Sequence, residues 1–233
     1  MTTAYVLPPA PTPSLPVVGT PARFAVRRIY CVGRNYAEHA REMGASGREA
    51  PFFFLKPADA LLPVEGSAPT HLPYPSLTQE LHHEVELVVA IGLGGRDIAV
   101  DEALRHVWGY AVGLDMTRRD LQAEMKKQGR PWCIGKGFDA SAPIAALTPA
   151  AQAGDLAQAH IRLQVNGQER QHGEIAHMIW NVAETIAALS RAWTLQPGDL
   201  ILTGTPAGVG PVQPGDGISA QIDGLTPLQL VVD

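Results

Sequence analysis

Leu-His-His-Glu-Val-Glu-Leu-Val-Val-Ala-Ile, at residues 81–91, is the strongest local pattern in the chain. Side chains alternate between the two faces of a strand, so Glu84 and Glu86 share one face and Val85 and Leu87 share the other. Two carboxylates ahead of a nearly continuous apolar run repel each other and resist burial unless a cation holds them. The pattern therefore predicts either a divalent metal site with oxygen ligands, or an edge strand with a solvated glutamate pair.

A third carboxylate favours the metal site. Asp115 follows an apolar segment and lies two residues before a helix that the sequence predicts over residues 117–128, with Thr117 as its cap. Taken alone, Asp115 could serve only to cap that helix. Taken together with Glu84 and Glu86, it makes a site for a divalent ion the favoured interpretation.

Composition restricts the class of protein. The chain has 233 residues, of which 45% are hydrophobic and 18% charged, enough apolar material for a sizeable core. Its net charge of −5 argues against a nucleic-acid partner, and no apolar stretch approaches the roughly 20 residues that span a bilayer. Only two cysteines occur, and the first basic residue is Arg23, so neither a disulfide framework nor a secretory signal is indicated. We expect a cytoplasmic protein without a membrane partner.

The chain divides into an arm and one domain. Residues 1–26 hold six prolines, so we expect an extended arm that lies over the surface and adds nothing to the core. Residues 27–233 form the expected catalytic domain, in which strand and turn signals outnumber helices. Asn166-Gly167 predicts a hairpin turn, and an amphipathic helix is predicted from Val182 to Trp193. The sequence thus predicts a strand-rich α+β fold with short helices.

Two further segments carry groups suited to acid–base chemistry. On a short helix predicted after Asn35, His39 and Glu42 are three residues apart and share a face, where the carboxylate would orient the imidazole and raise its basicity. A solvated pair is the alternative. Lys136 lies between two glycines in an apolar setting, which favours an anion-binding role over a flexible surface lysine.

Several motifs occur together and in order: Val32-Gly33-Arg34-Asn35-Tyr36, Phe54-Leu55-Lys56-Pro57, His82 to Leu87, Gly113 to Thr117, Gly135-Lys136 and Leu202 to Gly210. In this set the chain resembles the fumarylacetoacetate hydrolase family, in its branch of acylpyruvate hydrolases. The proline-rich arm, followed by the segment from Arg27 to Tyr36, looks most like the subgroup that acts on fumarylpyruvate or maleylpyruvate in gentisate-type aromatic degradation.

The resemblance implies a fold, a metal and roles for particular residues. The family fold is a mixed β-sheet roll, relatives are homodimers, and the cofactor is Mg²⁺ or Mn²⁺. Metal ligands would be Glu84, Glu86 and Asp115. His39 and Glu42 would activate water, and Lys136 is the matching active-site lysine. The groups that face the substrate would be Arg119, Gln122 and Thr205.

The implied reaction is cleavage of a 2,4-diketo acid to pyruvate and a C4 dicarboxylate. The divalent ion would polarise the 2-keto group while water attacks the distal keto carbon. The same enolate chemistry serves oxaloacetate decarboxylation and keto–enol isomerisation, which remain alternatives. A catalytically silent metal-binding dimeric scaffold is the alternative from a different class, and the presence of His39, Glu42 and Lys136 together argues against it.

Overall fold

The computed structural model describes residues 4–36 and 48–233. Its largest sheet has eight strands and mixes parallel with antiparallel pairs. In spatial order the strands are β4 (Phe52–Lys56), β3 (Arg28–Gly33), β15 (Asp199–Leu202), β8 (Val85–Ile91), β9 (Val107–Leu114), β11 (Ala142–Ile144) and β5 (Leu61–Pro63), with β12 (Thr148–Pro149) on β9. The apolar run of residues 85–91 is buried throughout, because β8 lies between β15 and β9.

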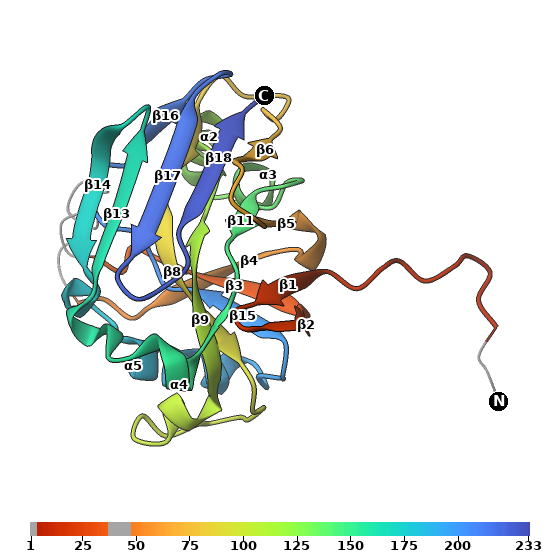
Figure 1. The fold of residues 1–233 in the computed structure, drawn as a ribbon, viewed down its shortest axis with the longest axis vertical. Helices are drawn as coiled ribbons and strands as arrows, with labels where there is room; N and C mark the ends of the chain where they lie inside the picture. The colour runs from red at the N-terminus through yellow and green to blue at the C-terminus, as the bar shows by residue number, and fades with distance from the viewer. Residues whose placement is uncertain (1–3, 37–47) are drawn as a thin grey trace.

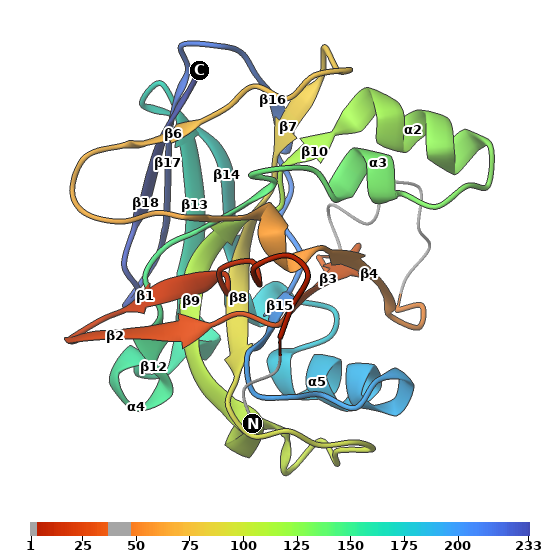
Figure 2. The ribbon, with the colours of Figure 1, turned by 90° about the vertical axis from the view of Figure 1, so that its right-hand side faces the viewer.

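A second sheet of five strands covers one side of the molecule (Figure 1). Its order is β14 (Gln168–Glu174), β13 (His160–Val165), β17 (Gly217–Ile222), β18 (Leu228–Val232) and β6 (Thr70–Leu72). Side chains of both sheets meet in the main hydrophobic core, for example Leu87 and Val89 from β8 with Ile161 and Leu163 from β13. A three-stranded sheet completes the roll (Figure 2). Its strands, in spatial order, are β10 (Thr117–Arg118), β7 (Leu81–His83) and β16 (Gly210–Val212).

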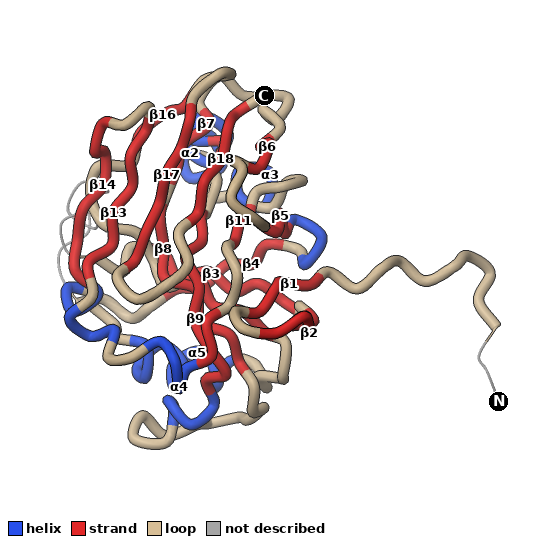
Figure 3. Tube along the Cα trace, viewed as in Figure 1, coloured by secondary structure: helices blue, strands red, loops and turns tan. Residues whose placement is uncertain are grey.

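Helices are few and short, so strands dominate the fold (Figure 3). The α-helices of the described residues are α2 (Arg119–Lys127), α3 (Cys133–Lys136), α4 (Ala150–Ala153) and α5 (Val182–Ala192). Single 3₁₀ turns lie at Ala58–Ala60, Ala103–His106, Leu156–Gln158 and Ile175–His177. The predicted strand-rich α+β roll is therefore confirmed. No helix within the described ranges is long and apolar enough to cross a membrane.

Local sequence signals explain two of these elements. Asn166 and Gly167 both have positive φ, 51° and 76°, as a type I′ turn requires, and they join β13 to β14. Helix α5 begins with a capping box. The side-chain oxygen of Asn181 accepts from the backbone N–H of Glu184, and the Glu184 carboxylate accepts from the backbone N–H of Asn181.

Two predictions need correction. In the arm, β1 (Ser14–Val17) and β2 (Thr20–Ala25) form a hairpin, and Leu15 is fully buried in a second hydrophobic cluster with Ile29 and Val88. The expectation that the arm adds nothing to the core is therefore wrong at Leu15, because alternation along β1 turns this side chain inward while Ser14 and Pro16 stay partly exposed.

The second correction concerns the helix after Asp115. Helix α2 begins at Arg119, because Thr117 pairs with His82 in the three-stranded sheet and its hydroxyl donates to the Asp115 carbonyl. Asp120, in the first turn of α2, accepts from the hydroxyl of Thr78 at 2.6 Å. The helix ends before Gly129, which has a φ of 64°.

Candidate active site

Strand register brings the three predicted carboxylates together. Strands β8 and β9 are antiparallel, with Val85 opposite Leu114, so the start of β8 meets the end of β9. Glu84 and Glu86 therefore lie beside Asp115, and the Asp115 amide donates to the Glu84 carbonyl at 2.9 Å. One carboxylate oxygen of each residue lies within 4.8 Å of the other two.

All three carboxylates are buried, with exposed fractions of 5% for Glu84, 2% for Glu86 and 1% for Asp115. A solvated pair on an edge strand is thereby excluded. Asp115 does not serve as a helix cap either, since its carboxylate contacts the buried ammonium groups of Lys56 and Lys136, at 2.8 and 2.6 Å. Burial of this much charge is tolerated only where each group has a partner.

Lys136 occupies the centre of the cluster. Its Nζ donates to Glu84 Oε2 at 2.8 Å and to Asp115 Oδ2 at 2.6 Å. Burial opposes the positive charge, but the carboxylates of Asp115 and Glu84 outweigh it and raise the pKa of the Lys136 ammonium. The group therefore stays protonated, and the alternative of a flexible surface lysine is excluded.

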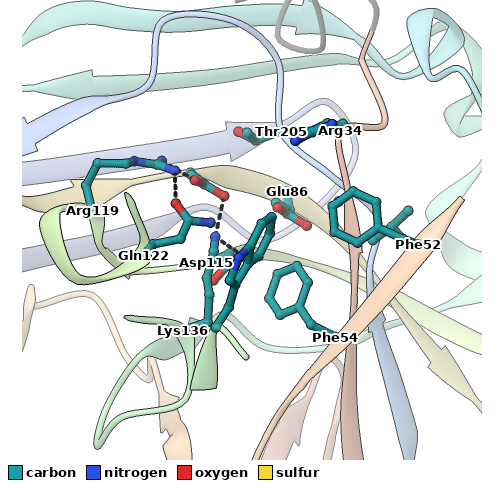
Figure 4. A pocket seen from close by; sticks show the side chains of 13 residues that line it. Arg34, Phe52, Phe54, Glu86, Asp115, Arg119, Gln122, Lys136 and Thr205 are labelled. Carbon is teal, nitrogen blue, oxygen red and sulfur yellow. Dashed lines mark hydrogen bonds and ion pairs between the residues drawn. The ribbon is translucent and has the colours of Figure 1, made fainter. Parts of the chain in front are cut away.

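Helices α2 and α3 supply the polar side of the cavity. Arg119 and Gln122 are three residues apart on α2 and share its inner face. Arg119 pairs with Glu84 and donates to Gln122 Oε1 at 2.5 Å (Figure 4). No described residue accepts from the Gln122 amide N–H groups, so they can bind a ligand. Gly135 of α3 packs against the Gln122 backbone, where a Cβ would lie 3.0 Å from the Gln122 Cα.

The loop after β15 supplies the opposite side. The Gly204 amide donates to Glu86 Oε2 at 2.7 Å, and this glycine has a φ of 98°. Thr205 Oγ1 accepts from Gln171 Nε2 at 2.8 Å. Since the oxygen is the acceptor in that bond, the hydroxyl hydrogen of Thr205 stays available for a ligand in the cavity.

Aromatic rings complete the cavity. Phe52 and Phe54 from β4 both pack against Trp132, with ring centroids 5.5 and 5.9 Å apart. We call these three side chains the aromatic wall. They line the same cavity as the three carboxylates, Lys136 and Thr205, and Figure 4 shows the phenylalanines beside the acidic cluster.

The donor set fits a divalent metal ion. Asp115 Oδ1 is buried and accepts no hydrogen bond of good geometry, although Lys56 lies close to it. Burial, followed by the charges of Asp115 and Glu84, raises the pKa of Glu86 well above that of an ordinary glutamate. A cation among these oxygens would relieve that repulsion, and a set of carboxylate oxygens suits Mg²⁺ or Mn²⁺.

The predicted site residues divide into two groups. Seven of them, Glu84, Glu86, Asp115, Arg119, Gln122, Lys136 and Thr205, line one cavity. The predicted dyad, His39 and Glu42, lies outside the described residues.

Sequence reasoning missed two buried residues. Lys56 ends the apolar strand Phe52–Lys56, which is itself a signal that a lysine has a buried partner. Gln171 lies in a polar strand, Gln168–Glu174, with no such signal.

Comparison with known proteins agrees with this geometry. The model of the fumarylacetoacetate (FAA) hydrolase C-terminal family matches residues 28–233, so the chain belongs to this family of enzymes. Its structure resembles that of fumarylpyruvate hydrolase from Pseudomonas aeruginosa in complex with Mn²⁺ and pyruvate, with a TM-score of 0.96 and 55% identity over 98% of this chain and 99% of that chain.

Curated relatives carry other activities. The mitochondrial oxaloacetate tautomerase FAHD1 of Homo sapiens is 45% identical over 207 residues, 89% of this chain and 92% of the relative. The mitochondrial oxaloacetate decarboxylase of Dictyostelium discoideum is 45% identical over 199 residues, 85% of this chain and 90% of the relative.

Proposed function

We propose that the protein is a metal-dependent hydrolase that cleaves the carbon–carbon bond of an acylpyruvate, fumarylpyruvate or maleylpyruvate, to pyruvate and a C4 dicarboxylate. The observation that carries the proposal is the buried cluster of Glu84, Glu86 and Asp115 beside Lys136, in a cavity with an aromatic wall. A relative with the same fold and 55% identity is a fumarylpyruvate hydrolase.

Glu84, Glu86 and Asp115 would hold Mg²⁺ or Mn²⁺. When bound, such an ion polarises a carbonyl oxygen and stabilises the negative charge of an enolate. Burial of the three carboxylates keeps bulk water away from this region, which strengthens every electrostatic interaction within it.

Three hydrogen-bond donors face the cavity from different elements. Lys136 uses two N–H groups for carboxylates and retains a third. Gln122 retains its amide N–H groups, and Thr205 retains its hydroxyl hydrogen. We assign Lys136 and Gln122 to the oxyanion that forms when water adds to the distal keto carbon, and Thr205 to the pyruvate end. In comparable sites one such donor contributes about 3 kcal/mol to the transition state.

Arg119 would hold other groups in position and take no part in the reaction itself. Its guanidinium joins Glu84 to Gln122, so it holds a metal ligand and an oxyanion donor in one geometry. The water-activating pair in this proposal is His39 held by Glu42, which the sequence pattern supports. A cytoplasmic homodimer in gentisate-type aromatic catabolism is part of the same proposal.

The second candidate function is enol–keto tautomerisation or decarboxylation of oxaloacetate. It is favoured by the curated relatives with these activities at 45% identity. It needs the same metal and the same stabilised enolate, but no attack by water.

The substrate that the protein turns over separates the two functions, and released pyruvate reports cleavage. The Mn²⁺-loaded protein is mixed separately with fumarylpyruvate, maleylpyruvate and oxaloacetate, with and without EDTA, and the enol absorbance of oxaloacetate is followed in parallel. We expect the protein to cleave an acylpyruvate faster than it changes oxaloacetate, and we expect EDTA to abolish the cleavage. Turnover of oxaloacetate alone would replace the hydrolase proposal by the second candidate. Glu86→Gln is the matched inactive control.

A further inference from the structure

Arg34 is a cation of the cavity that the proposed chemistry does not use. Lys56, Lys136 and Arg119 each contact a carboxylate of the acidic cluster. Among the described residues, no carboxylate lies within ion-pair distance of Arg34. Its Nε is buried and has no hydrogen-bond partner in the described part of the chain, although the residue lines the cavity. A buried guanidinium N–H without an acceptor is costly, which indicates that a ligand supplies the acceptor.

The backbone holds Arg34 in a strained conformation at the edge of the site. Its φ is 55°, in the left-handed region, which costs a residue other than glycine about 1 kcal/mol. The next residue fixes this geometry, because the Asn35 amide donates to the carbonyls of Trp180 and Thr203 and accepts from the Trp180 amide. Strain that neighbouring bonds enforce is typical of functional positions.

Sheet topology places Arg34 opposite the lysine side of the cavity. Strand β3 runs parallel to β15, so Arg34, just after β3, lies at the same edge of the sheet as the loop that carries Thr205. Figure 4 shows Arg34 and Thr205 on one side of the acidic cluster and Lys136 on the other. A ligand that contacts both sides must extend across the cavity.

The aromatic wall lies between these two sides. Arg34 is centred 5.6 Å from the Phe52 ring, which packs directly on Gly33, where a Cβ would lie 2.0 Å from a ring atom. Phe52 in turn meets Trp132 edge to face. Flat apolar surface with an arginine at its end is complementary to a planar, unsaturated chain that ends in an anion.

Charge balance supports the same ligand. Counted over the residues that the structure describes, the three carboxylates and the three cations paired with Glu84 and Asp115 cancel, so a divalent ion adds two positive charges. The carboxylate and the developing enolate of a pyruvate head balance those two charges. The positive charge of Arg34 then remains, and a second, distal carboxylate would balance it.

We propose that Arg34 is a specificity-determining residue that binds the distal carboxylate of the substrate, so that the enzyme prefers acylpyruvates with an anionic tail over those with a neutral tail. This inference rests on the proposed function for the identity of the head group. Fumarylpyruvate and maleylpyruvate both end in such a carboxylate, and the inference assigns its recognition to Arg34.

Binding of a matched pair of ligands tests the role of Arg34 without turnover. 2-Oxoheptanedioate and 2-oxoheptanoate have the same α-keto acid head and chain length, and only the first ends in a carboxylate. Neither has the 4-keto group that the cleavage requires. Calorimetry on the Mn²⁺-loaded protein should show that the wild type binds the dicarboxylate roughly 10- to 100-fold more tightly, as expected for a charged hydrogen bond.

Variants then locate the preference. Arg34→Gln should bind both ligands equally, Arg34→Lys should retain part of the preference, and Arg96→Gln, a change of an exposed arginine, should behave as wild type. Equal binding by the wild type, or a preference that survives in Arg34→Gln, would overturn the assignment. Cleavage of fumarylpyruvate is measured separately. If the wild type prefers the dicarboxylate but does not cleave fumarylpyruvate, the proposed function is wrong and the role of Arg34 stands.

Discussion

Replacement of Gln171 tests how the site is held together. This side chain is fully buried on β14 and bonds to four groups. Its Oε1 accepts from His83 Nδ1 at 3.0 Å and from the Val85 amide at 3.1 Å, while its Nε2 donates to Thr205 Oγ1 and to the Pro206 carbonyl. One amide therefore joins the segment that carries Glu84 to the loop that carries Thr205.

Gln171→Met keeps the length of the side chain and removes all four bonds. The Val85 amide and the Pro206 carbonyl would remain buried without this partner, and each unsatisfied group costs about 1–3 kcal/mol. We therefore expect the free energy of unfolding to fall by about 2–5 kcal/mol, measured by urea denaturation with tryptophan fluorescence. Gln168→Met, on the exposed end of the same strand, is the control and should change it by less than about 0.5 kcal/mol.

Gln171→Glu separates the chemical role from the stabilising one. The glutamate still accepts from His83 and Val85, but it cannot donate to Thr205, so the Thr205 hydroxyl must turn its hydrogen toward residue 171. The cavity then loses a donor, and KM for the acylpyruvate should rise about 10-fold with a smaller change in kcat. Two results together would refute this role of Gln171. They are an unfolding free energy of Gln171→Met within about 0.5 kcal/mol of wild type, and an unchanged KM in Gln171→Glu.

Three further predictions follow from the same geometry. Mn²⁺ at about 100 times its Kd should stabilise the fold by about 2.7 kcal/mol, seen as a higher Tm that EDTA reverses. Glu86→Gln should lose most of this increase in Tm. A full increase in that variant would argue against Glu86 as a metal ligand. Lys136→Met should lower kcat/KM by about 100- to 1,000-fold while Mn²⁺ still raises the Tm, because the lysine is a hydrogen-bond donor to the substrate and not a metal ligand. Loss of both the activity and the Mn²⁺-dependent rise in Tm would indicate a structural role. Asn181→Ala should cost about 1 kcal/mol of stability in urea without affecting kcat/KM, since it removes only the capping box of α5.

Features with a local cause could be predicted from the sequence. The alternation of residues 84–87 placed both glutamates on one face, and the burial of β8 follows from its apolar run. The Asn166-Gly167 turn depends on the φ values of two adjacent residues, which sequence specifies directly. The position of Asp115 in the acidic cluster was predictable only together with Glu84 and Glu86, since an acidic residue at the end of a strand could also have capped the next helix.

Features that depend on distant segments could not be predicted in this way. The burial of Leu15 requires that the arm pair with itself and pack on β3, whose position no local pattern reveals. Gln171 receives its role from the register between β13 and β14, which turns it inward while Gln168 and Glu169 stay exposed. Whether Arg34 has an ion-pair partner among the described residues likewise depends on which carboxylates the fold brings near.

Electrostatic balance links the metal and the substrate of this site. Among the described residues, Lys56, Lys136 and Arg119 pair with Asp115 and Glu84, so the three cations equal the three buried carboxylates in number although none of them contacts Glu86. These same cations compete with a divalent ion for the carboxylate oxygens and weaken its binding to the free protein. An anionic head group removes that penalty, because Lys136, Gln122 and Thr205 offer it their unused hydrogens. Coupling between two bound ligands is reciprocal. The head group therefore raises the affinity of the protein for the ion, and the ion raises the affinity for the head group by the same factor. The lysines in the acidic cluster therefore favour joint occupancy of the site by metal and diketo acid over binding of either one alone.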